Sequence, residues 1–140
     1  MENLEKIKLD AEKIAEKYDL DLLLLFGSRA KGNVHKFSDY DFGYVARNDF
    51  DYIKIGELGM DLEKSTHSRF VEIVDLKKAG PFLLKEIVKN NVVIFAKEYA
   101  YEVFFSYAVR NYLESNRLFE LQKTLYSQTV NKYKQKIYAK

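Results

Sequence analysis

Two aspartates separated by one residue carry the clearest chemical signal in this sequence. Asp39 and Asp41 lie at the start of a predicted strand over residues 39–46. Because alternate residues of a strand point the same way, the two carboxylates face one side. Like charges this close are costly unless a cation lies between them, and Mg²⁺ binds one or two carboxylates together with substrate phosphates. Asp-X-Asp is also typical of turns and strand ends, so the pair needs support from its surroundings.

A glycine-serine turn precedes the aspartates. The apolar segment 20–26 predicts a buried strand that ends at Gly27, and Ser28 follows it. Glycine lets a phosphate approach the backbone closely, and a serine offers a hydroxyl and an amide to hold it. Arg29 and Lys31 add cations to the polar loop predicted over residues 27–38. The turn is not a Walker A loop, because no Gly-Lys-Ser/Thr follows at the required distance.

A third carboxylate, Glu72, lies in a predicted strand over residues 70–76. It points away from Val71 and Ile73, which form the apolar side of that strand. Asp75 is a weaker candidate because its position along the strand places it on the side opposite Glu72. Three carboxylates, a glycine-serine turn and a basic loop together favour metal-assisted phosphoryl or nucleotidyl transfer.

The rest of the chain predicts an alternation of helices and strands. Helices are expected over 3–18, 52–64 and 81–89, and the remaining strand over 92–96. Residues 97–140 contain no glycine or proline and predict one long helix or two joined helices. The expected organisation is a single domain with a core over 1–96 and a helical extension over 97–140, packed on that core or on a partner.

Composition narrows the function. With 140 residues, 47% hydrophobic and 31% charged, the chain resembles a soluble globular domain. It has no cysteine and two histidines, which excludes disulfides, thiolate metal sites and a three-histidine zinc site. No secretory signal is visible and the apolar runs are too short for a bilayer, so a cytoplasmic location is expected.

The C-terminal extension is basic and aromatic. It holds eight basic residues against four acidic ones, and seven of the eleven tyrosines. The charge fits a solvated helix face, or else a surface for RNA or an acidic partner. The aromatic residues fit packing on the chain's own core, or an interface.

Three motifs give the chain a family resemblance. The motifs are Gly27-Ser28-Arg29-Ala30-Lys31-Gly32, Ser38-Asp39-Tyr40-Asp41 and Val71-Glu72-Ile73-Val74-Asp75-Leu76. They resemble the signature of the nucleotidyltransferase superfamily related to DNA polymerase beta, and the small size is similar to its minimal nucleotidyltransferases. The resemblance covers residues 3–96. It implies a nucleotidyltransferase fold of the α/β (α+β) class, a small mixed sheet flanked by helices, followed here by a helical tail.

The resemblance also implies roles for the motif residues. Gly27 and Ser28 would hold the nucleotide phosphates, and Asp39 and Asp41 would bind two Mg²⁺ ions, with ATP as substrate. Glu72 would help to hold one metal ion and activate the acceptor hydroxyl, where the family usually has aspartate. Arg29 and Lys31 are further nucleotide-binding candidates.

Members of this subfamily are typically antitoxins that transfer AMP from ATP to a tyrosine of a HEPN-domain ribonuclease toxin. The resemblance therefore implies such a partner, in a hetero-complex or oligomer, without direct binding of nucleic acid or membrane. The Glu72 departure leaves open a second hypothesis, an antitoxin that neutralises its partner by binding alone. A third hypothesis is nucleotidyl transfer to a small molecule, for which no second domain forms an obvious acceptor pocket.

Overall fold

The computed structural model describes residues 2–32 and 39–138, and side chains from Leu4 onward. Ser38, which belongs to the second motif, lies outside the described residues. The helices and strands follow one another as α1 Glu2–Tyr18, β1 Leu20–Phe26, α2 Ser28–Lys31, β2 Tyr40–Ala46, α3 Tyr52–Thr66, β3 Val71–Asp75, α4 Pro81–Lys89, β4 Asn91–Ala96 and α5 Ala100–Tyr138.

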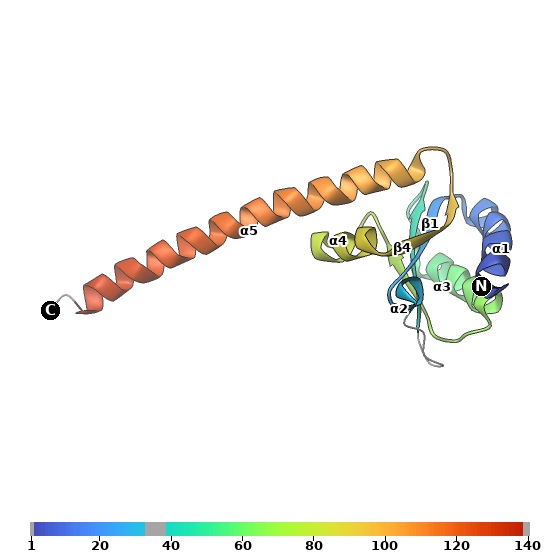
Figure 1. Ribbon diagram of the computed structural model, residues 1–140, viewed down its shortest axis with the longest axis horizontal. Coiled ribbons are helices and arrows are strands. Elements are labelled where there is room, and N and C mark those ends of the chain that lie inside the picture. The colour runs from blue at the N-terminus through green and yellow to red at the C-terminus, as the bar shows by residue number, and fades with distance from the viewer. Residues whose placement is uncertain (1, 33–38, 139–140) are drawn as a thin grey trace.

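The four strands form one mixed sheet in the order β3-β2-β1-β4. Strand β1 is antiparallel to both of its neighbours, whereas β2 and β3 are parallel. Helices pack on both faces of this sheet, which confirms the predicted fold class (Figure 1).

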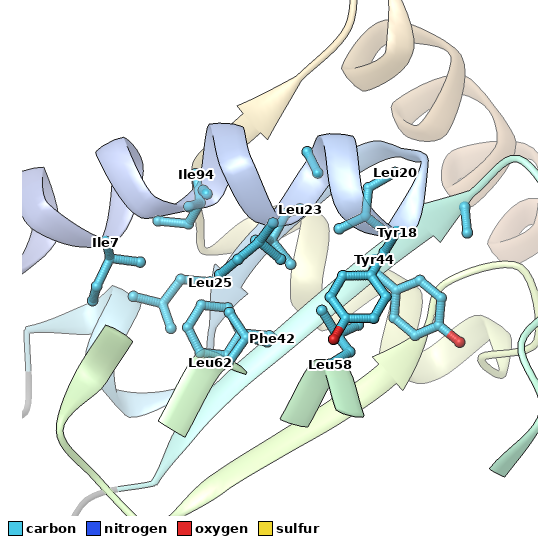
Figure 2. Close-up of a cluster of buried hydrophobic side chains, with 14 of the residues drawn as sticks. Ile7, Tyr18, Leu20, Leu23, Leu25, Phe42, Tyr44, Leu58, Leu62 and Ile94 are labelled. Carbon is cyan, nitrogen blue, oxygen red and sulfur yellow. The ribbon is translucent and has the colours of Figure 1, made fainter. Parts of the chain in front are cut away.

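Helices α1 and α3 cover one face of the sheet. The apolar residues of α1 recur every three or four positions and meet the inward residues of β1 and β2. Figure 2 shows this layer, in which Leu23, Leu25 and Phe42 lie between the two helices. Tyr40 and Phe42 are 5% and 0% exposed and belong to this core, so they point to the side of β2 opposite Asp41.

Helices α4 and α5 cover part of the other face. Leu22 and Leu24 of β1 pack there against Leu84 and Ile87 of α4 and Phe104 of α5. This face also carries Asp41, because Asp41 alternates with the residues of β2 that face α1 and α3.

Several predicted boundaries differ from the structure. The predicted loop after Gly27 contains a single helical turn, α2. Strand β2 begins at Tyr40, so Asp39 lies just before it. Helix α3 continues to Thr66, and its N-terminus is capped by the Asp51 side chain, which accepts a hydrogen bond of 2.8 Å from the Lys54 amide.

The C-terminal extension is one helix, α5, rather than two. It starts beside the sheet and then leaves the rest of the chain (Figure 1). Within residues 2–32 and 39–138, no helix is both long and apolar enough to cross a membrane.

Candidate active site

Asp41 and Glu72 are register partners on the parallel strands β2 and β3. Neighbouring strands are about 4.8 Å apart, so side chains at partnered positions on one face are close. Asp41 is half-buried and Glu72 is exposed. The proximity of Asp41 to Glu72, the third predicted carboxylate, therefore results from strand register.

Charge accumulates around Asp41. Burial raises the pKa of the Asp41 carboxyl above its usual value, and the negative charges of Glu72 and Asp39 raise it further. A hydrogen bond to Glu72 acts in the same direction on this pKa. Glu72 and Asp39 thus both lie close enough to Asp41 to act on its carboxylate.

Gly27 lies directly against this cluster. Its backbone has φ 74°, a left-handed conformation that disfavours residues with a Cβ. A Cβ at this position would overlap the Asp41 Oδ2. The strand register also pairs Asp41 with Phe26, the residue before Gly27. The glycine therefore makes room for the carboxylate at the end of β1.

Gly43 is a site residue that the sequence analysis did not assign. It lies two positions after Asp41 on the same face, and a Cβ there would meet the Leu76 Cδ2 at 2.6 Å. Leu76 is fully buried and belongs to the apolar cluster on this face of the sheet. The available signal was a glycine inside a strand, which often marks a close approach of another group.

The Arg29 side chain of the loop lies over an aromatic ring. The Arg29 guanidinium carbon is 4.1 Å from the centre of the Tyr40 ring. Tyr40 itself points to the side of β2 opposite the carboxylates. Lys31 is exposed, and Ser28 is half-buried at the start of α2. The phosphate-binding roles of Ser28, Arg29 and Lys31 stay predictions.

Asp75 does not join the cluster. It is the register partner of Tyr44, and its side chain accepts a hydrogen bond of 3.0 Å from the Lys77 amide. Burial raises the pKa of Tyr44 to about 12, and the charge of Asp75 contributes to this rise. Asp75 therefore lies on the Tyr44 side of the sheet and shapes the turn after β3.

The donor set suits Mg²⁺ chemically. Within the described parts of the chain, no group of three or more histidine, aspartate and glutamate side chains is already arranged to hold a metal ion. Asp39, Asp41 and Glu72 nevertheless offer only carboxylate oxygens, which are the ligands that Mg²⁺ prefers. Burial and the negative charges of Glu72 and Asp39 raise the pKa of Asp41, and a bound cation would offset both effects.

The chain is similar to characterised proteins. Over 85 residues it is 32% identical to the protein adenylyltransferase MntA of Shewanella oneidensis, a match covering 61% of this chain and 60% of that protein. The match thus spans about three fifths of the length of this curated relative.

Two solved structures have a similar fold. A toxin-antitoxin structure with AMP-PNP has a TM-score of 0.68 and 25% identity, covering 84% of this chain and 98% of that one. A tri-AMPylated Shewanella oneidensis HEPN toxin in complex with MNT antitoxin gives a TM-score of 0.64 and 22% identity, covering 87% and 98%.

A match between this chain and a protein-family model identifies its family. The model described as "Polymerase beta, Nucleotidyltransferase" matches residues 7–100. This range includes the glycine-serine turn and all three carboxylates. Because the match covers more than half of the chain, the protein belongs to the polymerase beta nucleotidyltransferase family.

Proposed function

We propose that this chain is a protein adenylyltransferase that transfers AMP from ATP to a tyrosine hydroxyl of a HEPN-domain ribonuclease toxin. The observation that carries the proposal is the register pairing of Asp41 with Glu72 beside Gly27. Membership of the family, the name of the MntA relative and AMP-PNP in a similar toxin-antitoxin structure support the same activity. Added phosphate charge at an RNA-cutting site would block the toxin, which makes this chain an antitoxin.

The reaction is a single displacement at phosphorus. The tyrosine oxygen attacks the α-phosphorus of ATP, and the bond from that phosphorus to the oxygen bridging to the β-phosphate breaks. Pyrophosphate leaves with the electron pair of the broken bond. Glu72 is exposed beside Asp41, and it accepts the proton of the tyrosine hydroxyl. Gly27 and Ser28 bind the phosphates of the nucleotide at the end of β1, together with Arg29 and Lys31.

Asp39, Asp41 and Glu72 are the residues that would hold Mg²⁺. When bound, the cation neutralises phosphate charge and orients the triphosphate. ATP is a cytoplasmic metabolite, and a cytoplasmic location follows from its use as substrate. The core over residues 1–96 would carry this chemistry, and the extension over 97–140 would contact the partner.

Label transfer tests the proposal. The purified chain is incubated with its HEPN-domain partner, Mg²⁺ and each α-labelled nucleoside triphosphate. We expect a labelled partner band with ATP, and a loss of at least about 100-fold in rate for Asp39→Asn/Asp41→Asn, because metal ligation supplies several kcal/mol of transition-state stabilisation. Asp49→Asn is the matched control, since Asp49 is exposed and lies after β2. Transfer that survives the double variant contradicts the assignment.

A second candidate is neutralisation by binding alone. The glutamate at position 72 favours this second candidate. Glutamate is one methylene longer than the aspartate usual in the family, and metal sites tolerate only small displacements of their ligands. In that case the wild-type chain transfers no label, and the Asp39→Asn/Asp41→Asn variant still neutralises its partner.

A further inference from the structure

One face of α5 changes from buried to exposed along its length. Positions three or four residues apart from Phe104 to Ile137 form one continuous helix face, and eight of these ten positions are apolar or aromatic, the exceptions being Ser115 and Gln122. The complete series is Phe104, Ala108, Tyr112, Ser115, Phe119, Gln122, Tyr126, Val130, Tyr133 and Ile137. These positions therefore lie on the same side of α5 along most of its length.

The first half of this face is covered by the chain itself. Phe104 is 4% exposed and Ala108 is fully buried against the sheet and α4. The ring centres of Tyr112 and Phe82 of α4 are 6.1 Å apart in an edge-to-face arrangement. Lys85 also donates a hydrogen bond of 3.2 Å to the Tyr112 hydroxyl. The proximal half of the face is therefore an intramolecular interface between α4 and α5.

The second half of the face has no such cover. We call Phe119, Tyr126, Val130, Tyr133 and Ile137 the distal stripe. Tyr126 is 71% exposed and Ile137 is 66% exposed. In Figure 1 the orange-to-red part of α5 runs away from every other element. A helix gains most of its stability in proteins from packing its apolar face, so this surface is suited to a partner.

Lysines border the distal stripe on both sides. Lys132 and Lys134 flank Tyr133 in the sequence, so at about 100° per residue they lie on opposite sides of the stripe. Lys123 falls on the same side as Lys134, and Lys136 on the same side as Lys132. The described helix contains no acidic residue after Glu120. One border of this surface is therefore basic, with Lys123 and Lys134, whereas the other combines Lys136 with the exposed Leu118 and Leu125.

We propose that the distal stripe docks on a helical surface of the acceptor protein that is apolar at its centre and bordered by aspartates and glutamates. An apolar helix face with anchors every three or four residues fits a groove between helices. A basic rim favours a groove with acidic residues along its border, and the opposite charges accelerate association. This inference rests on the proposed function for the identity of the partner.

The size of the surface argues that the same partner also occupies the active site. Residues 117–138 form a helix about 33 Å long, and one face about 10 Å wide gives roughly 300 Å². Stable complexes bury about 800 Å² on each partner. The distal stripe therefore supplies part of a larger interface, which must leave the acceptor tyrosine able to reach the carboxylates.

Two other occupants fit less well. A second copy of this chain would place two basic rims against each other, and like charges across an interface are unfavourable. RNA binding requires cations that face phosphates, whereas here aliphatic and aromatic side chains fill the centre and the lysines lie at the edge.

The test compares two double variants of equal charge in the full chain. Tyr126→Glu/Tyr133→Glu places acids on the distal stripe, and Thr124→Glu/Asn131→Glu places them on the opposite face of the same helix segment. Affinity for the purified HEPN-domain partner is measured by calorimetry. We expect the stripe variant to bind at least about 30-fold more weakly and the control variant to stay within about threefold of wild type. Circular dichroism confirms that both variants keep the same helix content.

Equal effects of the two variants, or no binding of the HEPN-domain protein by the wild-type chain, overturn the proposal. Self-association in sedimentation that only the stripe variant loses also overturns it, in favour of a second copy. Binding of a labelled RNA that only the stripe variant loses overturns it in favour of RNA.

The docking proposal and the transfer proposal can be tested independently of each other. Asp39→Asn/Asp41→Asn is expected to bind the partner as wild type does. If binding depends on the distal stripe but the wild-type chain transfers no AMP, docking stands and the adenylyltransferase proposal fails. If AMP transfer occurs but the stripe variant binds and transfers normally, the docking proposal fails alone.

Discussion

Gly27 leaves open the space that the Asp41 carboxylate occupies. A side chain at position 27 would overlap the Asp41 Oδ2, and the backbone there has φ 74°. The turn after β1 and the carboxylate on β2 are therefore one structural unit. This relationship explains why a glycine and an aspartate fourteen positions apart belong to the same site.

Gly27→Ala is expected to abolish AMP transfer and to reduce the free energy of unfolding by about 1–3 kcal/mol, because φ 74° with ψ −154° is a backbone conformation open essentially only to glycine. Gly32→Ala is the matched control, since Gly32 also has positive φ but has no atom within 4 Å of an added Cβ. The control also places a Cβ at positive φ, in the less costly left-handed helical region, and it does not displace Asp41. If both variants lose transfer equally, the close contact with Asp41 is not what the site requires.

Asp41→Asn is expected to raise the melting temperature at pH 7 by a few degrees. Burial and the charges of Glu72 and Asp39 raise the pKa of Asp41 in the folded chain, so folding favours the protonated form. The resulting destabilisation is absent below the unfolded pKa of 3.8 and develops as pH rises through the folded pKa. Melting curves from pH 3 to pH 7 should therefore diverge only toward neutral pH. Unchanged or lower stability of the variant at pH 7 contradicts this electrostatic account.

Mg²⁺ is expected to stabilise the wild-type chain at pH 7, because a ligand that binds only the folded state raises its melting temperature. Asp39→Asn/Asp41→Asn should show no such increase. Thermal melts with Mg²⁺, and again after EDTA, measure the difference without any catalytic readout. Equal responses of the two proteins would place the cation elsewhere.

Glu72→Gln and Asp75→Asn should separate the two acids of β3. Glu72→Gln removes the proposed base and is expected to slow transfer by about 100-fold or more, in line with general-base contributions. Asp75→Asn is expected to leave the rate within a few-fold, because Asp75 lies on the Tyr44 side of the sheet. Initial rates with saturating ATP decide between them, and a slow Asp75 variant beside a normal Glu72 variant would reverse the assignment.

Asp61→Asn should reduce the free energy of unfolding by about 1 kcal/mol at pH 7. Burial raises the pKa of Asp61, but hydrogen bonds from Lys17 at 2.8 Å and Tyr18 at 2.6 Å outweigh it, so the pKa is lowered overall. A lowered pKa gives stability above the unfolded value of 3.8 that is lost as pH falls through the folded value.

Urea denaturation at pH 7 and at pH 3 measures this contribution, and the two proteins should converge at the lower pH. Lys17→Met is the control, since Lys17 is the more exposed partner and its loss should cost less than the loss of Asp61. A constant difference between Asp61→Asn and wild type at both pH values would exclude the ionised carboxylate as the cause.

The strands that carry Asp41 and Glu72 could be predicted from the sequence because polar and apolar residues alternate along each of them. Asp41 and Glu72 alternate with core residues, so their common side followed from strand geometry before any contact was known. The periodicity did not reveal that Gly43 lies against Leu76, since this contact depends on how β2 and the turn after β3 pack. It also did not reveal the position of Arg29 over Tyr40, because the loop conformation is set by α2.

Helix α5 shows a second feature that could not be predicted from the sequence. Helical spacing continues without interruption from residue 100 to residue 138, so the sequence could not tell where α5 stops packing on its own core. That transition depends on where α4 begins, because Phe82 and Lys85 near its N-terminus contact Tyr112 and the contacts of α4 reach no further along α5 among the described residues.

The central claim is AMP transfer to a tyrosine by the carboxylates at Asp39, Asp41 and Glu72. The most direct measurement is the intact mass of the HEPN-domain partner after incubation with this chain, ATP and Mg²⁺, followed by peptide mapping. The account predicts a mass increase of one or more AMP groups on tyrosine, present with wild type and absent with Asp39→Asn/Asp41→Asn. An unmodified partner after incubation with folded wild-type chain, or modification that survives the double variant, would contradict it.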